Sequence, residues 1–224
     1  MMDAKLLFQA LGKFLFGLAI IAVLLFVPAG TLNYFNGWLF IALLFIPMFI
    51  AGIVMFIKSP ELLKRRLNAK EEENEQKLVI MISGIMFLCS FIVAGLNFRF
   101  QWLELPQSVV IISSIIFLLS YIMFSEVLRE NVYLSRTVEV SENQKVVDNG
   151  LYGIVRHPMY TSTILLFLSM PLILNSPLSF VIMLIYPIII LFRIRNEEKV
   201  LERELEGYKE YKEKVKCRII PFIF

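Results

Sequence analysis

The sequence predicts an all-α integral membrane protein, with five to six membrane-embedded helices arranged as hairpins and a cytosolic amphipathic helix near the C-terminus. Three observations lead to this fold class. First, 58% of the 224 residues are hydrophobic, well above the roughly 45–50% of an ordinary soluble domain. Second, the apolar residues lie in uninterrupted blocks, and the mean hydropathy is +0.73. Third, most of the charged residues, 18% of the chain, lie between those blocks.

The first part of the chain, residues 1–135, is predicted to form about four membrane spans in two helical hairpins. Each of its apolar blocks is close to the roughly 20 residues that a membrane helix needs. A short polar turn joins the blocks of each predicted hairpin. The blocks cover residues 14–29, 38–57, 78–96 and 109–128.

A short surface helix is predicted directly after the second block. Ser59 stands where an N-cap residue is expected, and Pro60 follows at the first helical position. Proline is well tolerated there, because the first N–H groups of a helix have no intrahelical partner.

The last third of the chain is less regular. Residues 137–140 and 145–147 flank a polar turn, and we expect short strands there. The apolar stretch of residues 160–192 is interrupted by three prolines, which predicts two short helical legs and thus a third, shallower hairpin. From residue 193 to 216, apolar residues recur at helical spacing within a charged segment. This pattern predicts an amphipathic helix, bent at Gly207.

The distribution of lysine and arginine predicts the orientation. The second and fourth connections between apolar blocks are rich in both residues, whereas the first has none and the third has only Arg99. Cytoplasmic loops carry an excess of these residues, so we expect the basic connections to face the cytosol across a prokaryotic cytoplasmic membrane. The net charge of +3 belongs mostly to these loops and gives no indication of a nucleic-acid partner.

Two polar stretches at the predicted membrane face carry the candidate chemistry. Residues 149–160 contain the only histidine of the chain, His157, with an arginine and two tyrosines. Residues 193–198 place two arginines beside Glu197 and Glu198. Considered separately, each stretch has a structural explanation, because tyrosines are common at membrane interfaces and acidic residues favour a helix start.

Together, the two stretches resemble the signature of one family. The pattern Gly-x-Tyr-x-x-Val-Arg-His-Pro-x-Tyr at residues 150–160, followed by Arg-Ile-x-x-Glu-Glu at residues 193–198, is similar to that of the isoprenylcysteine carboxyl methyltransferases and their phospholipid methyltransferase relatives. The likeness covers roughly residue 145 to the C-terminus. It implies an S-adenosylmethionine-dependent methyltransferase, with residues 136–224 as the motif region.

The resemblance also implies the residues of the site. Carboxylates accept hydrogen bonds from ribose hydroxyls, and tyrosine faces stabilise a sulfonium. Arg193 is expected to hold an acceptor carboxylate through a bidentate contact, and Arg156 is grouped with it as catalytic while shaping the wall of the site. His157 and Glu198 are expected at a water-facing mouth, and no metal site is expected. The implied cofactor residues are Tyr152, His157, Pro158, Tyr160, Glu197 and Glu198.

The implied acceptor is a lipid or a prenylated small molecule or protein, reached from the cytosol and sideways from the bilayer. The break in the third hairpin at residues 175–177 is a candidate for the lateral entrance. Carboxyl O-methylation of an isoprenylcysteine-like substrate is the expected reaction, and phospholipid N-methylation and small-thiol methylation stay open. A scaffold or transporter would be a different class, in which ionisable residues are expected inside the spans. The long spans carry almost none.

Overall fold

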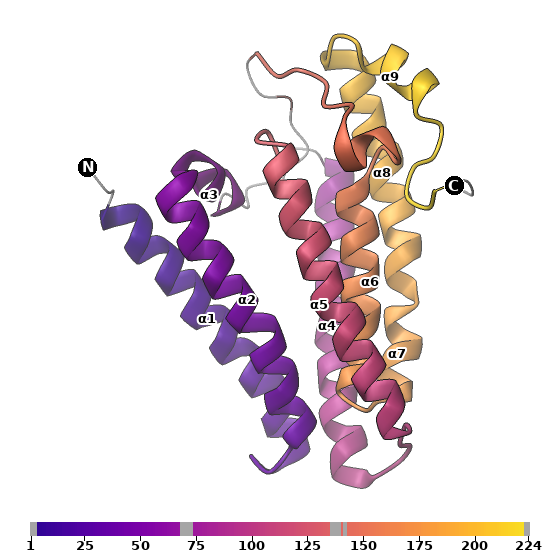
Figure 1. Ribbon diagram of the computed structural model, residues 1–224. Helices are drawn as coiled ribbons and strands as arrows, with labels where there is room; N and C mark the ends of the chain where they lie inside the picture. The colour runs from indigo at the N-terminus through magenta and orange to yellow at the C-terminus, as the bar shows by residue number, and fades with distance from the viewer. Residues whose placement is uncertain (1–3, 68–73, 135–139, 141–142, 222–224) are drawn as a thin grey trace.

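The computed structural model describes residues 4–67, 74–134, 140 and 143–221, and within them every regular element is helical. The predicted all-α fold class is confirmed. Figure 1 shows the helices as one elongated bundle, in which α1 and α2 diverge from the others towards one end. The elements are α1 (Ala4–Ala29), α2 (Phe35–Lys58), α3 (Pro60–Leu67), α4 (Asn74–Phe100), α5 (Gln107–Glu130), η1 (Gly150–Gly153), α6 (Pro158–Ile173), α7 (Pro177–Met183), α8 (Ile185–Glu204) and α9 (Tyr208–Lys214).

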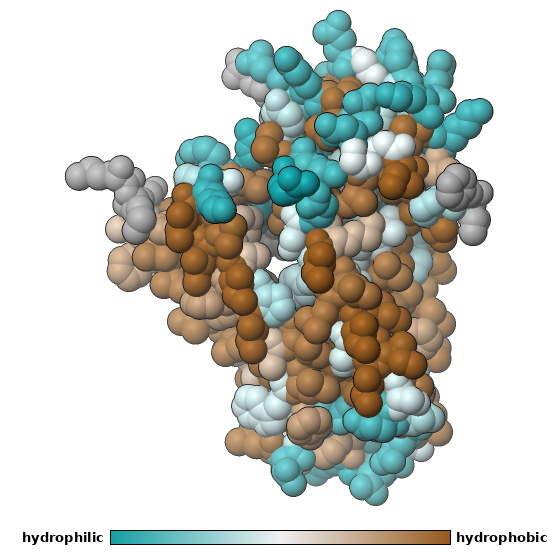
Figure 2. Space-filling model, in the orientation of Figure 1, coloured by the Kyte–Doolittle hydropathy of each residue, from teal (hydrophilic) through white to brown (hydrophobic). Residues whose placement is uncertain are grey.

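Five helical stretches in the described residues are long and apolar enough to cross a membrane. They are α1, α2, most of α4, α5, and α7 together with α8. Figure 2 shows an apolar surface over the middle of the bundle and hydrophilic residues at its two ends. These features fit a multi-pass integral membrane protein, since lipid rather than water covers such a surface.

The four predicted N-terminal spans are present as α1, α2, α4 and α5, and α1 packs against α2 as the first predicted hairpin. A short connection joins α4 to α5, but α4 packs mainly against α1 and α5 mainly against α6. Helices α1 and α4 approach closely at Gly95, where an added Cβ would lie 2.6 Å from the carbonyl oxygen of Leu25. Small residues allow such close packing between membrane helices. The predicted surface helix is α3, and Pro60 is its first residue. The carbonyl of Ser59 accepts the first hydrogen bond, from the N–H of Leu63.

The third hairpin differs from its prediction in the length of its second leg. The first leg, α6, has 16 residues and spans about 24 Å at 1.5 Å per residue. The expectation of a short second leg is wrong, because only Leu184 separates α7 from α8. Pro187 does not break α8, since it lies in the first turn, where a proline costs little. The predicted amphipathic helix from residue 193 is therefore the continuation of α8, and its bend at Gly207 is confirmed by a φ of +82°.

The hairpin is complete rather than shallow, because its turn reaches the connections of the other two hairpins. The hydroxyl of Tyr34 donates to the carbonyl of Leu174 at 2.6 Å. The side chain of Asn97 donates to the carbonyl of Asn175 at 3.1 Å. In return, the side-chain oxygen of Asn175 accepts from the N–H of Leu105 at 2.7 Å.

The predicted strands are not supported where they can be assessed. Most of the first one, at residues 137–140, lies outside the described residues. Residues 145–147 are described and have no regular structure.

Candidate functional site

Both polar stretches lie at the end of the bundle that also holds α3 and α9 (Figure 1). The loop that brings the first stretch there depends on Gly150, whose φ is +55°. A Cβ at this position would lie 1.7 Å from a carboxylate oxygen of Glu130. That carboxylate accepts hydrogen bonds from the N–H of Leu151 at 2.9 and 3.1 Å. Only glycine fits both the backbone conformation and the space.

The C-terminal segment, residues 215–221, covers the loop of residues 149–157 through backbone hydrogen bonds. The N–H groups of Arg156 and His157 donate to the carbonyls of Cys217 and Arg218, each at 2.9 Å. The hydroxyl of Thr161, one turn into α6, donates to the carbonyl of Ile219 at 2.7 Å. Three segments that are distant in sequence, the loop, α6 and the C-terminal segment, are thereby held together.

A buried ion cluster centred on Glu198 joins the same loop to α8. Arg156 Nε donates to Glu198 Oε1 at 2.8 Å, and His157 Nε2 lies 3.2 Å from the same oxygen. Arg218 Nε donates to Glu198 Oε2 at 3.3 Å. The Arg156 and Glu198 side chains are each 4% exposed. Buried charges are tolerated only when they are paired and hydrogen-bonded, so these groups stabilise one another.

The guanidinium of Arg156 also binds the chain that covers it. Its Nη1 donates to the carbonyls of Val215 and Lys216, at 2.6 and 2.7 Å. Together with the bond to Glu198, these contacts fix the arginine between α8 and the C-terminal segment.

A cleft opens beside this cluster, with a volume of about 830 Å³ including its open mouth. The cleft is lined by Asn131, Tyr133, Leu134, Gln144, Lys145, Val146, Val147, Tyr152, Arg156, His157, Met159, Tyr160, Arg193, Glu197, Leu201, Leu205, Tyr208 and Tyr211.

The inner end of the cleft, defined by Tyr160, Arg193 and Glu197, is ionic. The buried hydroxyl of Tyr160 donates to Glu197 Oε2 and accepts from Arg193 Nε at 2.9 Å. Arg193 and Glu197 are one helical turn apart on α8, so their side chains lie on the same face. A cation and an anion thus border the same space, and one hydroxyl contacts both.

The outer end of the cleft, defined by Val146, Leu201, Leu205, Tyr208 and Tyr211, is apolar and aromatic. The Tyr211 hydroxyl donates to the carbonyl of Tyr152 at 2.7 Å. The Tyr208 hydroxyl is buried and, within the described part of the chain, is the one buried side-chain polar atom without a hydrogen-bond partner. Burial raises the pKa of Tyr208, and the negative charges of Glu198 and Glu197 raise it further.

Most of the residues implied by the sequence line this cleft: Tyr152, Arg156, His157, Tyr160, Arg193 and Glu197. Pro158 is fully buried and does not line it. The expectation that His157 and Glu198 lie at a water-facing mouth is wrong, because these residues are 5% and 3% exposed. Consecutive helical residues point about 100° apart. Glu197 therefore faces the cleft, while Glu198 faces Arg156 and His157.

The expected lateral entrance is also wrong. The break at residues 175–177 lies at the opposite end of the bundle, where Asn175 contacts Asn97 and Leu105. Sequence reasoning also missed Asn131, Tyr208 and Tyr211 as cleft residues. In the sequence, the two tyrosines belong to the amphipathic spacing of residues 193–216 and to the segment that resembles the family, and neither pattern indicates that they line the cleft.

The fold and the site define a class, namely a multi-span membrane protein with a cleft of ionic and aromatic residues at one end of its bundle. Residues 108–207 match the family model described as phospholipid methyltransferase, in agreement with the resemblance in the sequence. The matched segment begins at α5 and contains both polar stretches that border the cleft. This match supports a membrane methyltransferase.

A curated protein with a similar segment is the Delta(14)-sterol reductase TM7SF2 of Mus musculus. The two sequences are 28% identical over 91 residues, which are 39% of this chain and 22% of the reductase. The chain thus matches less than a quarter of the length of that protein.

Proposed function

We propose that this protein is an S-adenosylmethionine-dependent carboxyl O-methyltransferase that acts on a membrane-associated, isoprenylcysteine-like acceptor. The observation that carries the proposal is the ionic inner end of the cleft, where Arg193 and Glu197 flank the hydroxyl of Tyr160. This end offers a cation for an acceptor carboxylate beside an anion for a sulfonium. The family match supports methyl transfer in a membrane protein.

The residues of the cleft fit the cofactor, which supplies an electrophilic methyl group on a positively charged sulfur. Glu197 attracts a cation, because two unit charges about 4 Å apart interact by about 4 kcal/mol near a protein surface. The ring of Tyr160 adds cation–π attraction. His157 and Tyr152 complete the wall around this charge. We assign cofactor contacts to these four side chains.

Arg193 suits the acceptor. Its Nε is held by the Tyr160 hydroxyl, which orients the planar guanidinium, and such a fork recognises a carboxylate by two parallel hydrogen bonds. A carboxylate is ionised at neutral pH and needs no general base. The tasks left to the protein are positioning of the acceptor and exclusion of water.

Arg156 and Glu198 have a positioning role in this proposal rather than a catalytic one. Both side chains are buried and hydrogen-bonded. They hold His157 and the C-terminal segment in place around the cleft.

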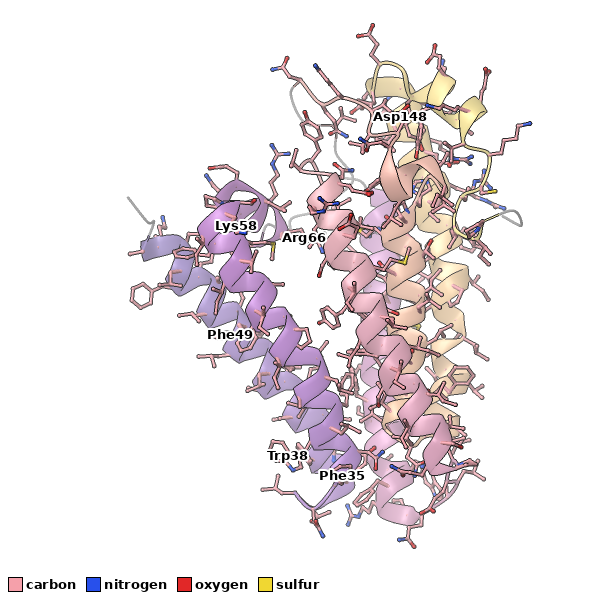
Figure 3. All side chains as sticks on the ribbon, viewed as in Figure 1. Phe35, Trp38, Phe49, Lys58, Arg66 and Asp148 are labelled. Carbon is pink, nitrogen blue, oxygen red and sulfur yellow. The ribbon has the colours of Figure 1, made fainter. Side chains whose placement is uncertain are left out.

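The acceptor needs a path from the bilayer, and the side of the bundle between α2 and α5 offers one. The two helices are joined where the Tyr121 hydroxyl donates to the carbonyl of Leu44 at 3.0 Å. Towards the site end, Figure 2 shows a hollow between them. At its upper end, the guanidinium of Arg66 lies 5.3 Å from the ring of Phe124 (Figure 3). An apolar chain with an anionic head fits this combination.

Phospholipid N-methylation is the second candidate, favoured by the description of the matched family model. Its ammonium acceptor would have to lose a proton before attack. The carboxylate of Glu197, already hydrogen-bonded by Tyr160, or the imidazole of His157, which also lines the cleft, could accept it. The likeness to a protein named as a sterol reductase is compatible with any acceptor that partitions into lipid.

The test measures which product forms. Membranes that contain the protein are incubated with S-adenosylmethionine labelled in its methyl group and with prenylcysteine, ethanolamine phospholipid or a small thiol. Mild alkali then releases volatile methanol from a methyl ester. We expect volatile label with prenylcysteine. Label that stays with the lipid or the thiol after alkali would reject the carboxyl assignment.

Arg193→Ala should lower ester formation about 100-fold, because a charge-assisted hydrogen bond in the transition state is worth about 3 kcal/mol. Binding of S-adenosylhomocysteine, measured by calorimetry, should change little. The matched control is Arg195→Ala on the same helix, whose side chain is exposed and does not line the cleft. An equal loss of ester formation and cofactor binding in Arg193→Ala would place this arginine in the cofactor site instead.

A further inference from the structure

The hydroxyl of Tyr208 differs from those of the other buried tyrosines that line the cleft. Those of Tyr152, Tyr160 and Tyr211 have hydrogen-bond partners within the protein. Tyr208 is 4% exposed, and its hydroxyl has no partner in the described residues. Buried polar groups in folded proteins are nearly always paired. An unpaired one that borders a cleft is the type of group that a ligand satisfies.

The surroundings of Tyr208 determine which hydrogen-bonding role its hydroxyl can play. Burial and the charges of Glu198 and Glu197 raise its pKa, so the phenol keeps its proton at physiological pH and can donate. A ligand ammonium cannot accept a hydrogen bond. Glu198 and Glu197 disfavour a ligand carboxylate, and the nearby cation, Arg156, is already paired with Glu198. The partner is therefore a neutral acceptor atom.

The outer end of the cleft favours a flat ring as the source of that atom. Tyr208 and Tyr211 pack there with Leu201, Leu205 and Val146, whereas the ionic groups Arg193 and Glu197 border the inner end. A purine is apolar on its faces and has nitrogen acceptors on its edge. A purine therefore fits the apolar and aromatic outer end, whereas a positively charged sulfonium fits the ionic inner end.

We propose that Tyr208 is a specificity residue of the cofactor site, whose hydroxyl donates a hydrogen bond to a ring nitrogen of the purine. This inference rests on the proposed function, because the purine is that of S-adenosylmethionine. It also sets the orientation of the cofactor, with the nucleoside base under α9 and the reacting group near Tyr160.

The first test compares Tyr208→Phe with Tyr211→Phe in detergent-solubilised protein. Tyr208→Phe removes an unpaired hydroxyl, so the melting temperature without ligand should stay the same or rise. Its affinity for S-adenosylhomocysteine should fall about tenfold, the usual effect of one lost hydrogen bond. Tyr211→Phe removes the bond to the Tyr152 carbonyl and should lower the melting temperature without ligand.

The second test identifies the atom. The 1-deaza, 3-deaza and 7-deaza analogues of S-adenosylhomocysteine each replace one ring nitrogen by carbon. One of them should bind wild-type protein about tenfold more weakly than the parent compound does. In Tyr208→Phe, the same analogue and the parent compound should bind with equal affinity, because the hydroxyl that donates a hydrogen bond to this nitrogen is absent.

The outcomes separate the two proposals. If wild-type protein does not bind S-adenosylhomocysteine, the proposed function fails. If wild-type and Tyr208→Phe proteins bind it equally well, the proposed function stands and the role of Tyr208 is rejected. If Tyr208→Phe binds weakly but is as sensitive as wild type to every analogue, the hydroxyl contacts another atom and the purine assignment is wrong.

Discussion

The connections between helices are held by different kinds of side chain at the two ends of the bundle. At the end opposite the site, Tyr34, Asn36 and Asn97 donate to backbone carbonyls of residues 173–175. These side chains are neutral. At the site end, the buried and charged side chains of Arg156 and Glu198 hold the connecting segments together. Neutral groups cost less to bury than charges do. The end opposite the site, where the contacts only join helices, thus uses side chains with the lower desolvation penalty.

The ends also differ in how completely their polar groups are satisfied. Asn97 donates to the carbonyls of Leu103 and Asn175 and accepts from the N–H of Leu103. At the site end, the hydroxyl of Tyr208 is unpaired within the described residues. The end that holds the cleft thus differs from the opposite end not only in charge, but also because one of its buried polar groups has no partner within the described residues.

The largest effect is expected from neutralising the charge at the centre of the ion cluster. Glu198→Gln leaves Arg156 buried without its counter-ion and should reduce the free energy of unfolding by about 3 kcal/mol. Cofactor binding should weaken as a consequence. Thermal unfolding in detergent, with and without S-adenosylhomocysteine, measures both effects.

Glu197→Gln is the matched control, one position away on the same helix. It borders the cleft, so cofactor affinity should fall while the melting temperature without ligand stays close to that of wild type. If the two variants behaved alike, the distinction between the buried and the cleft-facing glutamate would be wrong.

These two glutamates also show what the sequence could predict. The motif places both at the membrane edge and implies a shared role. Which of them faces the cleft depends on the rotation of α8 against the loop, and the loop is held by residues 217–219. Contacts at such sequence separation leave no local signal. The spans, in contrast, were predictable because an uninterrupted apolar block needs no long-range partner to be recognised.

The same reasoning explains the errors in the third hairpin. Asn175 belongs to a predicted break that could admit lipid, because asparagine, serine and proline in succession are typical of a loop. Its contacts with Asn97 and Leu105 could not be read from the sequence. The proposed role of Tyr208 has no signal in the sequence for a related reason, since an unpaired hydroxyl is recognised only once all of its neighbours are known.

An intermediate effect is expected at the neutral end. Asn175→Ala removes the acceptor for the N–H of Leu105. It also places alanine at a φ of +56°, a conformation that asparagine tolerates better than alanine does. The free energy of unfolding should fall by about 2 kcal/mol. Asn175→Gly removes the same hydrogen bond but tolerates this φ, so it should cost less. Neither variant should change the affinity for S-adenosylhomocysteine, and a change in affinity would show that the two ends are coupled.

The smallest effect is expected from an exposed ion pair at the site end. Lys214 Nζ lies 2.7 Å from Asp148 Oδ2, and both side chains are largely exposed (Figure 3). Exposed pairs contribute little and are screened by salt. Asp148→Asn should therefore leave the melting temperature unchanged within error at physiological ionic strength. A clear fall in the melting temperature would mean that this pair stabilises the fold together with the buried ion cluster centred on Glu198.

The pH dependence of the same pair has a defined sign. The hydrogen bond from Lys214 lowers the pKa of Asp148. Any stability that the pair contributes is then present above the ordinary aspartate pKa and is lost as the pH falls below it. Melting curves of wild type and Asp148→Asn should accordingly differ least in acid.

The backbone pairing of residues 156–157 with residues 217–218 has a consequence for biosynthesis. A chain is made from its N-terminus, so α1 to α6 can enter the bilayer long before the carbonyls of Cys217 and Arg218 leave the ribosome. Until then, the guanidinium of Arg156 lacks the backbone acceptors that cover it in the finished protein. The cleft is thus completed after the bundle is already embedded, and a nascent chain remains without a finished cleft until residues 215–219 have been translated.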